Sequence, residues 1–156
     1  MTTTTQISFN NLIAQYPFSL DSIAKSIGIT KQFLSVLQKG SAIKRPELMR
    51  KHFLRIQIHI RQQAELMEAV KLSPENISII HSLPFSHSQL SKYCGKPVFF
   101  VDRTLQNPSH EDCALLQQKI NLIGNELKDI TITDYIEHDE IASILLNHKG
   151  HQLIML

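Results

Sequence analysis

The sequence predicts a mainly α-helical protein: a group of short N-terminal helices, one long helix, and an α-rich C-terminal region with possible short strands. Three observations support this fold class. Apolar residues recur every three to four positions along much of the chain, the spacing that buries one face of a helix. Gly28 separates two short stretches of this kind, and no glycine or proline interrupts the chain between Glu47 and Leu72. A hydrophobic share of 42% and a charged share of 19% are typical of a soluble protein with a core.

Three short helices are expected before residue 40. The first covers 7–15, the second follows Ser19, and the third covers 31–38 after Thr30. Ser and Thr hydroxyls accept hydrogen bonds from free amides at the start of a helix, so both residues are expected N-caps. Gly28 stands where a sharp turn needs a positive φ, and two short helices joined by such a turn form a helix-turn-helix. The expected buried positions of the last two helices are Leu20, Ile23, Ala24, Ile27, Leu34 and Leu37.

One long helix is expected from Pro46 to Leu72. Proline suits the first turn of a helix, and the carboxylate of Glu47 suits its positive end. Apolar side chains then alternate in steps of four and three residues, interrupted by Gln63, as in a coiled coil. This stripe predicts either the seam of a homodimer or an ordinary helix packed on the chain's own core. The residues of the predicted dimer seam are Met49, Phe53, Ile56, Ile60, Met67 and Val70.

The chain is expected to divide into an N-terminal region, 7–72, and a C-terminal region, 73–156. In the second region, the pattern predicts helices over 75–82, 111–127 and 134–147, a short strand over 130–133, a strand or helix start over 97–102, and an apolar strand or packed tail over 151–156.

A short internal repeat connects the two regions. Pro17-Phe18-Ser19 recurs as Pro84-Phe85-Ser86, and at the same offset Lys25, Gly28 and Phe33 recur as Lys92, Gly95 and Phe100. The repeat predicts a possible degenerate second helix-turn-helix over 84–106. Two residues depart from the first copy: Thr104 stands in the place of buried Leu37, and Asp102 puts an acid on the last helix.

Charge is unevenly distributed along the chain. Residues 1–71 contain ten Lys/Arg and four Asp/Glu, a net +6, whereas residues 72–156 contain six and ten, a net −4. A basic half joined to an acidic half indicates that one half meets a polyanion. The alternative is that these are only two solvated surfaces of opposite sign.

The stretch FSLDSIAKSIGITKQFLSVLQKG resembles the lambda-repressor/Cro-like (XRE-like) family of helix-turn-helix DNA-binding domains. The matching features are Ile23-Ala24, the turn 27–30, the buried Leu34 and Leu37, and Gly40 followed by a basic loop and Pro46. The resemblance covers only this N-terminal part. It implies that the second helix of the pair lies in the major groove of double-stranded DNA and that its early residues reach base edges.

Carried over by position, the resemblance implies two groups of contact residues. The residues expected to read bases are Lys31, Gln32, Ser35, Phe33 and Val36. The residues expected to hold phosphates are Thr30, Lys39, Lys44, Arg45, Arg50 and Lys51. The chain departs from the family at Leu20, where members usually place a phosphate-binding Gln, and in the apolar Phe33 and Val36.

No catalytic or metal site is predicted. His110 and Cys113 form one close pair of possible ligands, whereas a zinc site usually needs two such pairs. The chain shows no glycine-rich phosphate loop, no nucleophile elbow and no Ser/His/Asp set, so neither an enzyme nor a cofactor is expected.

These features together predict a repressor-like, sequence-specific DNA-binding transcriptional regulator. It is expected to act as a homodimer, because two copies double the length of DNA read. Its location is expected to be cytoplasmic, because Cys94 and Cys113 do not make a disulfide framework and nothing marks the chain as secreted. No membrane contact is expected, because no apolar run approaches the ~20 residues that span a bilayer. The acidic C-terminal region is expected to serve in dimerisation, effector sensing or contact with a protein partner. The alternative function is a protein-interaction adaptor or antagonist that keeps the helix-turn-helix as a structural unit.

Overall fold

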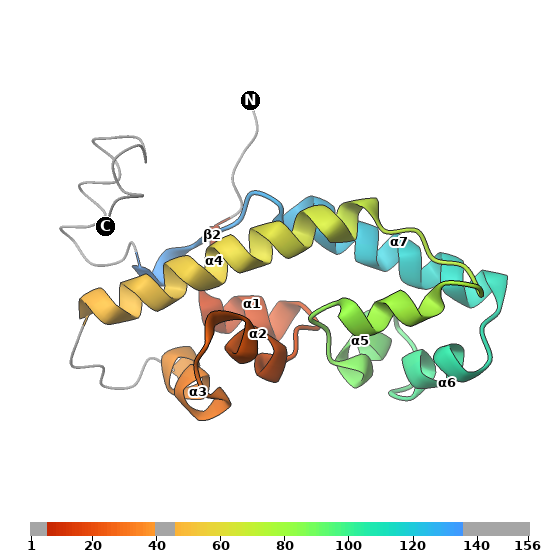
Figure 1. Ribbon diagram of the computed structural model, residues 1–156, viewed down its shortest axis with the longest axis horizontal. Coiled ribbons are helices and arrows are strands. Elements are labelled where there is room, and N and C mark those ends of the chain that lie inside the picture. The colour runs from red at the N-terminus through yellow and green to blue at the C-terminus, as the bar shows by residue number, and fades with distance from the viewer. Residues whose placement is uncertain (1–5, 40–45, 136–156) are drawn as a thin grey trace.

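The computed structural model describes residues 6–39 and 46–135. This part of the chain is mainly α-helical with short strands, as the sequence predicts (Figure 1). The first half contains strand β1 (Gln6–Ile7) and helices α1 (Phe9–Gln15), α2 (Leu20–Ile27), α3 (Lys31–Lys39) and α4 (Pro46–Ala69). The second half contains the 3-10 helix η1 (Ile77–Ser82), helices α5 (His87–Tyr93), α6 (Phe100–Gln106) and α7 (His110–Leu127), strand β2 (Thr131–Ile132) and the 3-10 turn η2 (Thr133–Tyr135).

The two long helices, α4 and α7, pack antiparallel and form the spine of the molecule (Figure 1). They approach closely at Gly124 of α7, where an added Cβ would lie 2.5 Å from the carbonyl oxygen of Ala64. Asn121 Nδ2 donates to the carbonyl oxygens of Met67, at 2.8 Å, and Val70, at 3.0 Å. These bonds satisfy carbonyls at the C-terminal end of α4, which have no partner within the helix.

The apolar stripe of α4 faces the interior of this same chain, which corrects the predicted dimer seam. Phe53, Ile56, Ile60, Met67 and Val70 all belong to the buried core, and Met49 is half-buried against it. The four-three spacing identified the buried face of the helix, but the elements that pack against α4 belong to this chain: α7, the segment after it, α2, and Phe9 of α1. These side chains are therefore not available as a seam between two copies of the chain.

The short N-terminal helices begin and turn at the predicted residues. The hydroxyl of Ser19 accepts a hydrogen bond from the Ser22 amide at 3.3 Å, and that of Thr30 accepts from the Phe33 amide at 3.0 Å. Gly28 ends α2 with φ of 75° in the left-handed region. The first helix is shorter than predicted, because Gln6 and Ile7 form β1 and Ser8 caps the helix from Phe9.

The second half differs from the prediction in one element and decides between two alternatives, strand or helix start, that the sequence left open in another. Segment 75–82 forms a 3-10 helix from Ile77 instead of an α-helix, and segment 97–102 is a turn followed by the start of α6, not a strand. Strand β2 lies within the predicted 130–133 and pairs in parallel with β1, with Gln6 opposite Thr131. Apart from its first residues in η2, the helix predicted over 134–147 lies outside the described residues, as does the predicted apolar end, 151–156.

One cluster of buried apolar side chains runs through both halves, from Ile7 to Ile132. Figure 1 shows α1 to α3 and α5 to α6 arranged along the same side of the α4–α7 pair, so that the two groups of short helices share one support. Within the described ranges, no helix combines the length and the apolar character that crossing a membrane requires.

Candidate nucleic-acid interface

Helix α3 separates its buried and outward-facing residues clearly. Leu34 and Leu37 are fully buried, whereas Lys31, Gln32 and Val36 are exposed. Because residues three to four apart share one face of a helix, the exposed residues form a single surface beginning at the first turn. This surface is where the resemblance places the base-reading residues.

The turn before α3 fixes the angle between the two short helices. Gly28 donates its amide to carbonyls at the end of α2, and the amide of Ile29 donates to the carbonyl of Ala24 at 3.0 Å. Ala24 of α2 is 1% exposed, and α2 packs against α3. The outer face of α3 is thus held by a fixed turn and a packed core.

Two of the residues predicted to read bases are less exposed to solvent than the sequence suggested. Phe33 is half-buried, and its ring meets the His52 ring of α4 edge-on, with 5.2 Å between centroids. Ser35 is also half-buried. Phe33 therefore braces α3 against α4, and the exposed group reduces to Lys31, Gln32 and Val36.

The structure describes some of the residues that were predicted to contact phosphate, and others lie outside the described ranges. Lys51 is exposed and Arg50 half-buried near the start of α4, next to the residue that holds Phe33. Thr30 is exposed, with its hydroxyl engaged in capping α3. Lys44 and Arg45 lie outside the described residues, and Lys39 is described only as the last residue of α3.

Two arginines that contribute to the basic half have structural partners. A guanidinium nitrogen of Arg55 donates to the carbonyl of Ile27 at the C-terminal end of α2. Arg61 Nε donates to the carbonyl of Ile130 at 2.7 Å. Sequence counting missed these roles, because both partners lie far from the arginines along the chain.

Two histidines of α4, the buried His52 and the half-buried His59, each have a buried ring nitrogen without a hydrogen-bond partner, Nδ1 of His52 and Nε2 of His59. Burial lowers the pKa of both rings below the ordinary value of 6.5, and for His52 the cations of Arg55 and Lys51 lower it further. Both rings are therefore expected to be neutral at pH 7.

Stability is expected to fall as the pH drops below about 6.5. The unfolded chain takes up protons on these histidines at a higher pH than the folded chain, so their contribution is complete above 6.5 and is lost toward the lower folded-state pKa. Each histidine contributes at most about 1.4 kcal/mol per pH unit to the slope of the free energy of unfolding against pH. Urea unfolding between pH 7.5 and 5.5 measures the slope. His59→Gln should reduce it, whereas His110→Gln, at an exposed position of α7, should not; equal slopes in all three proteins would contradict the assignment.

The two cysteines are free and buried, and burial raises the pKa of both thiols. A buried thiol with a raised pKa is a poor nucleophile. His110 is exposed while Cys113 is buried, and the described part of the chain contains no group of three or more His, Cys, Asp or Glu able to hold a metal ion.

The chain matches no protein-family model, no curated protein and no solved structure.

Proposed function

We propose that the chain is a sequence-specific DNA-binding transcriptional regulator in which α3 reads base edges in the major groove. The observation that carries this proposal is the exposed surface of Lys31, Gln32 and Val36 on the second helix of a helix-turn-helix, above the buried Leu34 and Leu37. The long helix α4 supports α3 through the contact between His52 and Phe33.

The exposed side chains suit the edges of base pairs. The Lys31 ammonium donates hydrogen bonds to guanine O6 and N7, and the Gln32 amide pairs with adenine through one donor and one acceptor. The methyl groups of Val36 fit against a thymine methyl. Phosphate contacts from Lys51 and Arg50 would set affinity and register without reading sequence.

The test is selection from random genomic fragments by the purified protein at about 50 mM and about 200 mM salt. Fragments that share a site should be enriched at the lower salt and largely released at the higher salt, because each phosphate contact releases counterions. No salt-sensitive retention of duplex DNA would contradict the proposal.

A second candidate function is a protein-interaction adaptor that docks through α3. Val36 is 40% exposed beside the half-buried Phe33, which leaves an apolar anchor on the same face. Apolar docking changes little as salt rises, whereas DNA binding falls steeply, so the salt series separates the two functions.

A further inference from the structure

The two halves of the chain meet in a reciprocal backbone contact between the repeated segments. The amide of Ser19 donates to the carbonyl of Pro84 at 2.9 Å, and the amide of Ser86 donates to the carbonyl of Pro17 at 3.0 Å. Pro17 and Pro84 are 67 positions apart, as are Ser19 and Ser86. Exchange of equivalent contacts between equivalent residues is the property of an interface with two-fold symmetry.

The same offset of 67 relates the aromatic residues, the caps and the turns. Phe18 and Phe85 stack on each other with 5.7 Å between ring centroids. The Ser19 hydroxyl caps α2 by accepting a hydrogen bond from the Ser22 amide at 3.3 Å. The Ser86 hydroxyl caps α5 by accepting from the Gln89 amide, also at 3.3 Å. Gly28 and Gly95 both have positive φ, 75° and 72°.

Buried positions also correspond, and the correspondence continues into the long helices. The pairs in which both residues are buried include Ile23 and Leu90, Ile27 and Cys94, Leu34 and Val101, Leu37 and Thr104, Phe53 and Ile120, Ile56 and Ile123, and Ile60 and Leu127. The chain is therefore built from two related units facing each other across a pseudo-two-fold axis. Helices α2 to α4 of one unit correspond to α5 to α7 of the other.

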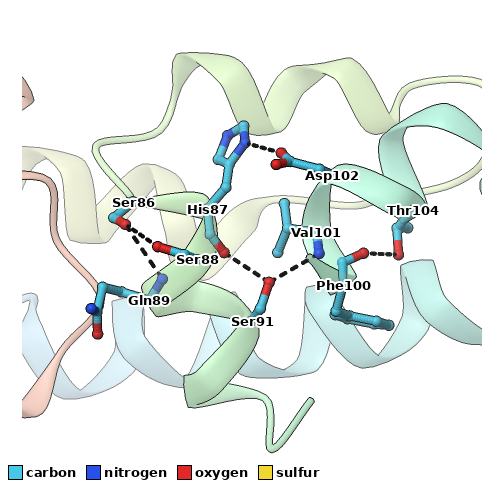
Figure 2. Close-up of polar contacts among 9 residues, drawn as sticks. All are labelled: Ser86, His87, Ser88, Gln89, Ser91, Phe100, Val101, Asp102 and Thr104. Atoms are coloured by element: carbon cyan, nitrogen blue, oxygen red, sulfur yellow. Dashed lines mark hydrogen bonds and ion pairs between the residues drawn. The ribbon is translucent and has the colours of Figure 1, made fainter. Parts of the chain in front are cut away.

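The polar residues of the second unit fit this arrangement (Figure 2). Ser91 stands in the place of Ala24, and its hydroxyl accepts from the Val101 amide at 3.0 Å, which ties α5 to α6. The buried Thr104 donates its hydroxyl to the carbonyl of Phe100 at 2.8 Å, so it leaves no unsatisfied group. The acid on α6, Asp102, lies 2.8 Å from Nδ1 of His87.

The outer face of α6 and the turn before it exposes apolar residues, the cation of Arg103 and the carboxylate of Asp102. Val98 is 48% and Phe99 55% exposed, and they occupy the positions of Lys31 and Gln32. The guanidinium of Arg103, at the position of Val36, lies over the Phe99 ring at 5.5 Å.

The segments that contain the two short helices of each unit have the same net charge. Segments 20–39 and 87–106 each contain three Lys/Arg and one Asp, a net +2. The acids that make the second half negative, apart from Asp102, lie outside segment 87–106. The net charge of segment 87–106 therefore suits the same polyanion as that of segment 20–39.

We infer that α6 and its preceding turn form a second contact with the same DNA duplex, so that one chain spans a site with two unlike halves. This inference rests on the proposed function. Figure 1 shows α3 and α6 toward opposite ends of the same side of the molecule, as two-fold-related recognition helices require. Arg103 binds phosphate or guanine, and the exposed Val98 and Phe99 contact thymine methyls. A single chain thus places two helices on two adjacent half-sites, as a homodimer of helix-turn-helix proteins does, but the two half-sites differ in sequence.

The test uses the full chain and a duplex selected from genomic fragments. We expect one chain per duplex by analytical ultracentrifugation, and a footprint over two adjacent segments of unlike sequence. Phe99→Ala and Arg103→Gln should each weaken binding roughly tenfold and remove protection from one segment, whereas Gln32→Ala removes protection from the other. Leu66→Ala is the matched control, because it truncates a side chain that is 60% exposed on α4. It should change neither the affinity for the duplex nor the footprint. Thermal unfolding verifies that each variant folds.

Different outcomes would overturn the two proposals. A palindromic site bound by two chains, or unchanged affinity and footprint in both α6 variants, overturns the second contact while the DNA-binding function stands; the Val98 and Phe99 surface then belongs to a protein partner. Absence of any salt-sensitive binding by the unmodified chain overturns both.

Discussion

Gly124→Ala is expected to lower the free energy of unfolding by about 2 kcal/mol or more, because it forces the two long helices apart. The new Cβ would lie 2.5 Å from the Ala64 carbonyl oxygen and closer still to the Glu68 amide nitrogen. Both are backbone atoms of α4, which cannot turn aside as a flexible side chain does. Alanine also favours the helix by about 1 kcal/mol relative to glycine, but this gain is smaller than the free-energy cost of the clash. Urea denaturation measures the difference.

Asn125→Ala provides the matched control for this substitution. Asn125 follows Gly124 in α7 and is exposed, so its truncation should change the stability by less than about 0.5 kcal/mol. If Gly124→Ala were as stable as the unmodified protein, α4 and α7 would not meet as described.

Gln32→Ala is expected to weaken binding to the selected duplex by about tenfold or more while leaving binding to random duplex nearly unchanged. The reason is that a bidentate amide–adenine contact discriminates between bases by about 1–3 kcal/mol and contributes little on a random sequence. Lys31→Ala should behave in the same way. Fluorescence anisotropy with both duplexes measures the ratio of the two affinities.

Lys51→Ala is the comparison that separates reading from electrostatic attraction. Lys51 is exposed on α4, one position before the residue that contacts Phe33. Its loss should weaken binding to both duplexes by a similar factor and reduce the salt dependence by about one phosphate contact. Equal losses from Gln32→Ala on the selected and random duplexes would remove Gln32 from the base-reading set.

Local signals in the sequence were sufficient to predict the first helix-turn-helix of the fold. Ser19, Gly28 and Thr30 act within a few residues of themselves, through caps and a left-handed turn, so their structural roles follow from composition and spacing. The periodicity of α4 likewise indicated which face is buried.

The questions that the sequence left open depend on contacts between distant segments. The apolar stripe of α4 does not indicate which element covers it, because a helix packed on a second chain and a helix packed on α7 need the same pattern of apolar residues. Phe33 lies exposed on a helical wheel of α3 alone, and only the fold brings His52 against it. The run from Pro97 to Asp102 has the β-branched and aromatic residues of a strand, but the contact with α5 sets its conformation as a turn and helix.

The measurement that tests the central claim most directly is amide NMR mapping of the chain on a selected duplex. We expect the largest changes in the amide signals of 31–36 in α3, with a second group at 98–103, and little change in the outward face of α4 around Leu66. Unchanged α3 signals in a saturated complex would contradict the claim that this helix contacts DNA.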